Sequence, residues 1–428
     1  VYTEPENCQD CYKCIRECPV KAIRIENNKA SIIAERCVYC GHCTQVCPTG
    51  AKKIRDGLTR AKLVVSKHPG KMYMSLAPSY VSEFGDIPVG RLISAIKRLG
   101  FAGVSETALG AELVTAETER FLAAAPEGVY LSSACPVVVD YIRKYAPELT
   151  ANITPIVSPM IAHAKILKEL YGDDIKIIFA GPCIGKKSEA DTYGGLVEVA
   201  ITFKDLRTWF EREGIEPAET EADGEETFVP YHSGAGAMYP VEGGMLAGFR
   251  SPGRRATHMA FSDLPTVKGV LEQLDTVNRR DTIFMELLAC KGGCINGPAK
   301  LKATSLAIKR YDIMDKCETG NPSKDFSHLD LHADFPADPQ ETKTTYPENR
   351  IKEALAAVGK TTAADELNCS SCGYDTCRDF AVAMLEGRAE DNMCASYMRK
   401  VAPDKAPALR QKIPAGGVIV NEELKIVE

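Results

Sequence analysis

Two cysteine-rich runs near the start of the chain constrain its fold more than any other feature. The first has the spacing Cys-x2-Cys-x2-Cys-x3-Cys-Pro and ends at Cys18-Pro19; the second repeats it 29 residues later and ends at Cys47-Pro48. A short strand-and-turn pattern follows the first run, over residues 22–28. Closely spaced cysteines in a chain of 428 residues are typical of metal binding, because disulfide frameworks belong mainly to short secreted proteins. The sequence therefore predicts a small duplicated metal-binding domain.

The duplicated run resembles that of bacterial ferredoxins with two [4Fe–4S] clusters, in which the fourth cysteine of each run binds the other cluster. This resemblance assigns one cluster to Cys8, Cys11, Cys14 and Cys47, and the second cluster to Cys37, Cys40, Cys43 and Cys18. We expect residues 1–60 to form an α+β ferredoxin-like domain that conducts electrons and does no chemistry of its own. A pair of zinc sites is the alternative, because four-cysteine sites also bind zinc.

After residue 70 the chain alternates between strand and helix patterns. Strands are expected over residues 71–79 (running into a turn), 128–132 and 175–180, and helices over 88–99, 137–145, 161–170, 203–213, 264–274 and after Pro298. This alternation predicts an α/β domain with a mixed or parallel sheet covered by helices. Residues 233–248 hold five glycines but lack the order of a nucleotide-binding loop, so we expect a flexible loop over a metal site.

Four further cysteines lie in this α/β region. Cys290 and Cys294 stand four apart, and the glycines at 292 and 293 let the backbone bend close to a metal centre. Two cysteines alone cannot hold an iron–sulfur cluster, so partners must come from elsewhere, and Cys135 and Cys183 are the candidates. Both follow apolar runs that end in small residues or proline, as expected where a buried strand delivers a side chain to the carboxyl edge of a sheet.

In order and approximate spacing, the three stretches around these cysteines resemble the signature motifs of [FeFe]-hydrogenases. The resemblance implies an H-cluster: a [4Fe–4S] cubane joined through one cysteine to a di-iron unit with carbonyl, cyanide and azadithiolate ligands. It implies that two sheet-and-helix lobes, within residues 68–317, surround this cofactor. The implied cubane ligands are Cys135, Cys183, Cys290 and Cys294, with Cys294 as the bridge.

Other positions also match the family. Lys186 matches the lysine that donates to an iron-bound cyanide, and Glu189 matches the glutamate that orients it. The alternative for Lys186 and Glu189 is an ordinary surface ion pair. Pro78 and Ser79 match the turn that faces the other cyanide.

Several positions depart from the family. Ala134 stands where standard members carry a second cysteine that passes protons to the cofactor amine, and alanine cannot titrate. Proton delivery is therefore expected to be slow. Gly181 and Leu288 replace methionines that usually pack on the di-iron unit. Glu117 corresponds either to a downstream relay glutamate or to an exposed helical residue.

The end of the chain predicts a separate module. Residues 318–348 are polar and rich in Xaa-Pro pairs, which indicates a linker. Residues 349–400 are expected to form a small, mostly helical domain with a third [4Fe–4S] cluster, with zinc as the alternative; the ligands are Cys369, Cys372, Cys377 and Cys394. This domain resembles one in corrinoid iron–sulfur proteins and in [FeFe]-hydrogenases assigned a sensory role (group C/D-like). Residues 401–428 resemble the start of a truncated PAS domain, or form a terminal hairpin.

The leading interpretation is a slow [FeFe]-hydrogenase that senses H2 and passes electrons along its [4Fe–4S] clusters to a redox or signalling partner. The alternatives are a ferredoxin-linked catalytic hydrogenase with another proton path, and a non-enzymatic hydrogenase-like iron–sulfur assembly protein. Maturases would supply the di-iron unit, and a homodimer is an open option. The net charge of −6 argues against a nucleic-acid partner. Short apolar runs and a start without a signal-peptide pattern argue for a cytoplasmic protein with no membrane partner.

Overall fold

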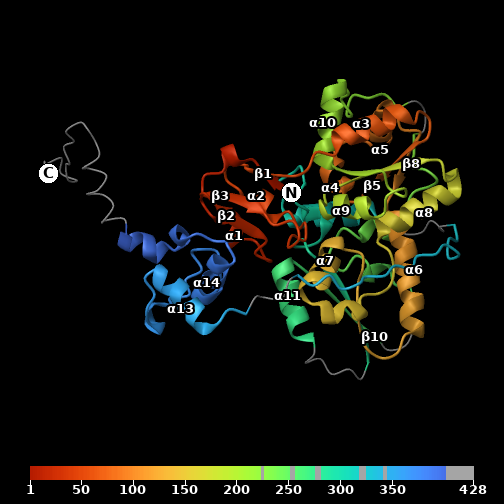
Figure 1. Cartoon of the computed structure of the whole chain (residues 1–428). Coiled ribbons are helices and arrows are strands. Elements are labelled where there is room, and N and C mark those ends of the chain that lie inside the picture. Colours follow the sequence, from red (N-terminus) through yellow and green to blue (C-terminus); the bar gives the residue numbers. More distant parts are fainter. Residues whose placement is uncertain (223–225, 251–255, 275–280, 318–323, 341–344, 402–428) are drawn as a thin grey trace, which may run out of the picture. The chain divides into compact units, whose positions relative to one another are not determined.

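The chain divides into two compact units in a computed structural model (Figure 1). The structure describes residues 1–222, 226–250, 256–274, 281–317, 324–340 and 345–401. Unit 1 contains Val1 and residues 35–45 and 54–342; unit 2 contains residues 2–34, 46–53 and the described residues after 342. The second cysteine run is thus divided between the units. The predicted tail at 401–428 lies outside the described residues except for its first position.

The larger sheet of unit 1 has four parallel strands in the order β6-β5-β8-β9. The strands are β5 (Met72–Leu76), β6 (Gly103–Glu106), β8 (Lys176–Gly181) and β9 (Val199–Thr202). Its helices are α3 (Leu58–Lys67), α4 (Tyr80–Phe84), α5 (Val89–Arg98), α8 (Pro159–Tyr171), α9 (Gly185–Thr192) and α10 (Phe203–Glu213). Helix α5 packs on β6, α8 on β5, and α10 on β8. The predicted strands correspond to β5 and β8.

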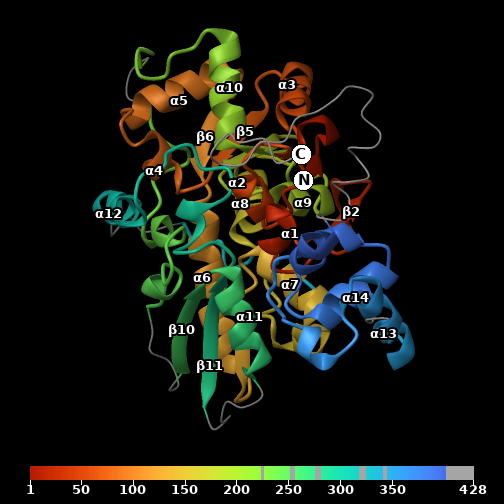
Figure 2. The ribbon, with the colours of Figure 1, turned by 90° about the vertical axis from the view of Figure 1, so that its left-hand side faces the viewer.

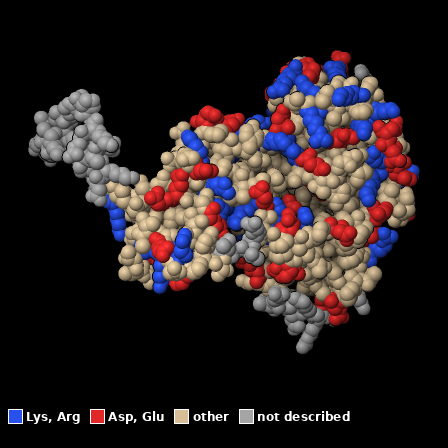
Figure 3. All heavy atoms as spheres, in the orientation of Figure 1, with Lys and Arg blue, Asp and Glu red and all other residues tan. Residues whose placement is uncertain are grey.

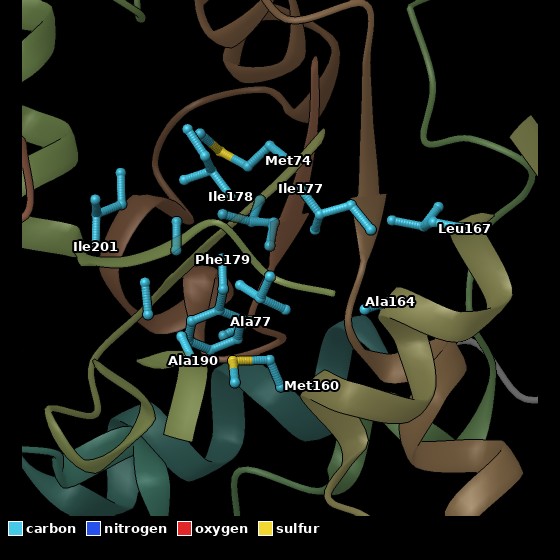
Figure 4. Close-up of a cluster of buried hydrophobic side chains, with 14 of the residues drawn as sticks. Met74, Ala77, Met160, Ala164, Leu167, Ile177, Ile178, Phe179, Ala190 and Ile201 are labelled. Atoms are coloured by element: carbon cyan, nitrogen blue, oxygen red, sulfur yellow. The ribbon is translucent and has the colours of Figure 1, made fainter. Parts of the chain in front are cut away.

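The core of this lobe forms where β5 and β8 meet helix α8 (Figure 4). Met74 of β5, Ile177 and Ile178 of β8, and Met160 and Leu167 of α8 are all fully buried. Each such side chain stabilises the fold by about 1.5–3 kcal/mol relative to an exposed one. This packing fixes the carboxyl ends of β5 and β8, which are followed by the Pro78–Ser79 turn and by the Cys183 motif.

The smaller sheet of unit 1 has three parallel strands in the order β10-β11-β7, with β10 and β11 side by side in Figure 2. The strands are β7 (Val129–Leu131), β10 (Ala256–Ser262) and β11 (Thr282–Leu288). Helices α7 (Pro136–Tyr145) and α11 (Leu264–Glu272) pack on this sheet, while α6 (Ala108–Ala124) packs on α8 and α12 (Leu306–Lys316) on α4. All seven residues of the central strand β11 are buried. The two sheets confirm the expected α/β domain with two lobes, and every ladder in them is parallel.

Unit 2 contains the first cysteine run and the C-terminal module. Strands β2 (Ile23–Glu26) and β3 (Lys29–Ile32) form an antiparallel hairpin, and β1 (Tyr2–Thr3) pairs with β4 (Lys52–Lys53). Helix α1 (Lys13–Arg16) lies inside the first run; α2 (His42–Val46) lies inside the second run and belongs to unit 1 except for Val46. This arrangement confirms the ferredoxin-like expectation.

The C-terminal module is built on two helices that pack together, α13 (Glu348–Ala357) and α14 (Cys377–Leu385). Helix α14 has nine residues. Thr376 caps its start by accepting a hydrogen bond from the amide of Asp379, and Gly387 just beyond its end has φ +66°. Local capping residues therefore set both ends.

The surface carries both charge signs. Figure 3 shows lysine and arginine side chains mixed with aspartate and glutamate over the face in view. Within the described ranges, no helix is both long and apolar enough to cross a membrane.

Candidate metal centre

Four cysteines from three distant loops come together in unit 1. Cys135 follows β7 and precedes α7, Cys183 lies between β8 and α9, and Cys290 and Cys294 follow β11. Burial, with a smaller contribution from the charge of Cys135, raises the pKa of Cys183 to about 11. Burial also raises the pKa of Cys290 and Cys294, with contributions from the other cysteines of the set. The four sulfurs are thus near enough to interact electrostatically.

This set of donors fits an iron–sulfur cluster. Cys135 is buried and the other three cysteines are half-buried. The raised pKa values of Cys183, Cys290 and Cys294 keep these thiols protonated at neutral pH without a metal, and binding iron would replace their protons. Among the residues that the structure describes, no three His, Cys, Asp or Glu side chains are spaced to hold a single metal ion. A [4Fe–4S] cluster instead takes one thiolate at each of several irons.

The glycines between Cys290 and Cys294 permit a close approach of two loops. Gly292 and Gly293 have φ values of +75° and +106°, and a Cβ at Gly293 would lie 2.3 Å from the carbonyl oxygen of Pro240. Pro240 also accepts a hydrogen bond of 3.2 Å from the amide of Ile295. The segment 233–248, expected as a flexible loop, is therefore packed against the third motif.

Lys186 and Glu189 form a buried ion pair on α9. The ammonium Nζ of Lys186 lies 2.6 Å from Oε2 of Glu189 and donates at 2.7 Å to Oγ of Ser158. Each side chain of the pair is 11% exposed, which does not fit an ordinary surface pair. The charge of Lys186 lowers the pKa of both Cys183 and Cys294, against the larger effect of burial. The cation therefore lies beside the sulfurs.

Ser79 supplies an orphaned polar atom in the same unit. Pro78 and Ser79 form the turn after β5, and Ser79 is 1% exposed. Its Oγ is buried and has no hydrogen-bond partner in the structure. Buried hydroxyls almost always have a partner, so this hydroxyl fits a site that receives an acceptor from a bound group.

The three departures from the hydrogenase pattern lie in well-packed surroundings. Ala134 lies directly before the N-cap residue of α7, and its amide donates to Oγ of Ser132 at 3.3 Å. A Cβ at Gly181 would lie 2.7 Å from the ring of Phe179, so this ring occupies the space that a longer side chain at 181 would need. Leu288 is 5% exposed.

Part of the second cysteine run lies directly on the cysteine site. A Cβ at Gly41 would be 2.6 Å from Cβ of Pro298 and 2.7 Å from Cδ1 of Ile184, which belong to the third and second motifs. The charge of the neighbouring Cys40 contributes to the raised pKa of Cys290. Glycine at position 41 therefore lets the two cysteine loops touch.

The other predicted cluster ligands are placed as follows. One cavity of unit 2 is lined by Cys8, Cys11, Cys14 and Cys47, the set that the crossed pattern predicts. Cys37, Cys40 and Cys43 belong to unit 1 and Cys18 to unit 2, so that set remains a prediction. In the C-terminal module Cys372, Cys377 and Cys394 are buried and Cys369 is exposed. Burial and the charges of Cys394 and Cys377 raise the pKa of Cys372.

Glu286 is a functional candidate to which the sequence analysis gave no role. It lies in the middle of β11, is 2% exposed, and its Oε2 has no hydrogen-bond partner. Burial raises its pKa to about 7; amides of Met245 and Leu246 oppose this shift, and the charge of Glu242 adds to it. The charge of Glu286 in turn contributes to the raised pKa of Cys294. The sequence carries one indication of this role, because Glu286 is the only charged residue in the apolar stretch that forms β11.

A second buried pair supports the Cys294 loop. Lys309 of α12 and Glu83 of α4 form an ion pair in which each side chain is 1% exposed. Glu83 also accepts from the amides of Leu301 and Lys302, and Lys309 donates at 3.4 Å to the carbonyl of Ile295. The pair thus ties two helices to the residue after Cys294.

We expect Lys309→Met to lower the free energy of unfolding by about 3–5 kcal/mol, because it leaves the Glu83 carboxylate buried without its cation. Urea unfolding of the full chain measures this. The double variant Glu83→Gln, Lys309→Met is expected to recover part of the loss. Lys302→Met is the matched control, since its partner Asp86 is 69% exposed and such pairs contribute about 0–1 kcal/mol. Equal losses in the two lysine variants would contradict the assignment.

Comparison with known proteins identifies the domains. The family model described as "Iron only hydrogenase large subunit, C-terminal domain" matches residues 70–273. A 4Fe–4S dicluster domain matches residues 4–51, and an Fe–S cluster domain matches residues 365–396.

Individual relatives are distant. Iron hydrogenase 1 of Clostridium pasteurianum is 24% identical over 315 residues, which cover 60% of this chain and 55% of the relative. The periplasmic [Fe] hydrogenase large subunit of Nitratidesulfovibrio vulgaris is 23% identical over 304 residues, covering 58% of this chain and 70% of the relative. This chain therefore spans only about half the length of the first relative.

The fold also has a solved counterpart. A variant of the [FeFe]-hydrogenase HydA1 from Chlamydomonas reinhardtii matches with a TM-score of 0.51 and 16% identity, over 67% of this chain and 100% of that structure. This likeness shows a shared fold. Residues 70–273 of the chain therefore match the model of an iron-only hydrogenase large-subunit domain, residues 4–51 that of a 4Fe–4S dicluster domain, and residues 365–396 that of a further Fe–S domain.

Proposed function

We propose that this protein interconverts H2 with protons and electrons at an H-cluster held by Cys135, Cys183, Cys290 and Cys294, with Cys294 as the bridge. The observation that carries this proposal is the convergence of four buried or half-buried thiols from three distant loops beside Lys186. When bound, the H-cluster supplies a low-valent metal with an open position, which protein side chains cannot offer.

The surrounding side chains would bind and orient the anionic ligands of this group. Lys186 would donate a charge-assisted hydrogen bond, while Glu189 and Ser158 fix the direction of its ammonium. The orphaned hydroxyl of Ser79 would donate on another side. Because these donors are buried, they act without competition from water.

Glu286 is the residue we propose to hold a proton near Cys294 in place of the thiol missing at Ala134. A pKa of about 7 lets its carboxyl be protonated or ionised at neutral pH, as a proton carrier requires. Its partnerless Oε2 is free to exchange the proton with a neighbour. Glu242, which is half-buried and raises the pKa of Glu286 by its charge, is the group that we propose to exchange the proton with Glu286.

Electrons would enter or leave through the second cysteine run, whose Gly41 touches two motifs of the site. We propose [4Fe–4S] clusters at the crossed cysteine sets of residues 1–60 and at the C-terminal cysteines, and a redox or signalling partner for the electrons. The missing thiol at position 134 supports slow turnover and hence a role in sensing H2. A cytoplasmic location and dependence on maturases complete the proposal.

Infrared spectroscopy after maturation tests the function directly. Bands of iron-bound carbonyl and cyanide that respond to H2 and CO are expected. Their absence from a matured sample with full cubane content would favour the iron–sulfur assembly class. Turnover then separates the two enzyme roles, because a rate close to that of standard hydrogenases would favour a ferredoxin-linked catalytic enzyme.

Ala134→Cys is expected to raise H2 evolution by about tenfold or more, since it restores a titratable group beside the site. A matched control is Ala134→Ser, which adds a similar volume without a group that titrates near neutral pH. An equal rise in both variants would assign the gain to packing. No rise in either would mean that proton supply at position 134 does not limit turnover.

A further inference from the structure

The C-terminal module touches the first cysteine run at the ligand-bearing loops of both. Gly373, next to Cys372, has φ +94°, and a Cβ there would lie 2.9 Å from Cγ2 of Ile15 and 3.1 Å from the amide nitrogen of Arg16. Ile15 directly follows Cys14 and is fully buried. Only a glycine at position 373 lets these two backbones approach so closely.

Arg16 bridges the same two loops. Its guanidinium donates at 3.0 Å to the carbonyl oxygen of Cys11 and at 3.4 Å to that of Ser371, so one cation spans a residue of each predicted cluster site. Lys21 adds a longer ion pair, 3.9 Å, with Asp375. The contact is therefore polar as well as closely packed.

A second set of contacts fixes the orientation of the module. The outer edge of β2 is covered, because the amide of Ile25 donates at 3.0 Å to the carbonyl of Arg388. The carboxylate of Glu390 accepts from the amides of Asn27 and Asn28, at 2.6 and 3.3 Å, in the turn of the β2–β3 hairpin. Both turn residues have positive φ values, as a type I′ hairpin turn requires.

We propose that the cluster of the C-terminal module exchanges electrons directly with the cluster of Cys8, Cys11, Cys14 and Cys47. The electron would cross where the loop that contains Gly373 contacts the loop that contains Arg16. One electron leaves one reduced cluster and reduces its neighbour, and no bond forms or breaks. The proposal rests on the proposed function for its electron source, which is H2 in turnover. The cluster of the C-terminal module is then the last in the electron-transfer path, and it receives its electrons from the cluster of the first cysteine run.

The donor sets on both sides fit such clusters. Cys8, Cys11, Cys14 and Cys47 line one cavity, and burial raises the pKa of Cys14 to about 11. On the other side Cys372, Cys377 and Cys394 are buried and Cys372 is electrostatically coupled to the other two. If the C-terminal module packed on the first cysteine run only to stabilise the fold, the loops that carry the cluster ligands would not need to lie at the centre of the contact.

Electron paramagnetic resonance of the full chain, reduced with dithionite, tests the order of the clusters. Spin–spin broadening of the C-terminal cluster signal is expected, and Cys11→Ala should remove it whereas Cys40→Ala should not. Broadening that survives Cys11→Ala, or that disappears with Cys40→Ala alone, would overturn the proposed neighbour. Iron content per chain confirms which clusters each variant has lost.

Two variants disturb the contact itself. Gly373→Ala places a Cβ against Ile15, and Glu390→Ala removes the carboxylate from the hairpin turn, four residues from the nearest cysteine. Both should reduce the broadening at unchanged iron content. Gly359→Ala is the matched control, because Gly359 also has positive φ, +68°, but has nothing within 4 Å. Unchanged broadening in Glu390→Ala, with the module released, would sink the proposal.

Hydrogen exchange shows whether the module is released, independently of any cluster signal. In Glu390→Ala the amides of Ile25 and Asn27 should exchange about tenfold faster than in the parent chain. The resonance and exchange measurements need no di-iron unit, so chain produced without maturases suffices. Missing infrared bands would then contradict the proposed function and leave this inference standing. A resonance signal of the C-terminal cluster without spin–spin broadening would contradict this inference and leave the proposed function standing.

Discussion

Replacing Cys294 with alanine is expected to abolish H2 turnover and to remove the infrared bands of the di-iron unit. In the proposed arrangement this one sulfur both binds the cubane and joins it to the di-iron unit, so its loss separates the reacting metal from its electron supply. Protein positioning of a cofactor of this kind depends on each ligand. Activity and infrared spectra of the matured variant, together with iron content, measure the effect.

Cys317→Ala is the matched control for the loss of a thiol. Cys317 is half-buried, and its Sγ donates to the carbonyl of Gly234 at 3.7 Å, a contact outside the four-cysteine site. This variant should keep the parent rate and the parent spectrum. If Cys294→Ala retained carbonyl and cyanide bands, a different residue would hold the di-iron unit, and the assignment of the bridge would be wrong.

The sequence predicted much of the site because parallel strands end at one edge of a sheet. Cys135 and Cys183 follow the predicted strands β7 and β8, and both are found where strand patterns end. Glycines at 292 and 293 likewise indicated the tight backbone that the structure shows. Signals of this kind are local, so a single sequence can carry them.

The remaining elements were harder to predict because their signals are short or non-local. Strands β6 and β9 have four residues each and are stabilised by neighbouring strands. The pair of Lys309 and Glu83 joins residues 226 positions apart. The docking of Glu390 on a hairpin turn joins residues 363 apart, and no periodicity in the chain indicates it. Such contacts depend on the completed fold.

Glu286→Gln is expected to lower H2 turnover by about 100-fold or more, since it replaces the proposed proton carrier with an amide of nearly equal size. The site should keep its infrared bands, because the change touches no proposed ligand. Glu117→Gln is the matched control, because it makes the same change of carboxyl to amide at a residue that pairs with Arg120 on α6. It should change the rate by no more than about twofold.

Glu286→Gln should lower turnover but raise the stability of the folded protein at pH 8. The direction of the stability change follows from the raised pKa of Glu286. Burial raises the pKa of Glu286 from 4.5 to about 7, so between these values the folded state holds a proton that the unfolded state has lost. The contribution of this group to stability is present below pH 4.5 and is lost as pH rises through 7, by about 3 kcal/mol. Glu286→Gln cannot lose a proton there and should therefore keep that stability at pH 8.

Urea unfolding at pH 4.5 and pH 8, beside H2 evolution, distinguishes a proton carrier from a structural residue. If Glu286 carries protons and destabilises the fold when ionised, Glu286→Gln should be slower in turnover and more resistant to urea at pH 8. A variant that is both slower and less stable at both pH values would show instead that the carboxyl supports packing. Full activity in Glu286→Gln would move the proton path away from β11, because an amide there cannot release a proton.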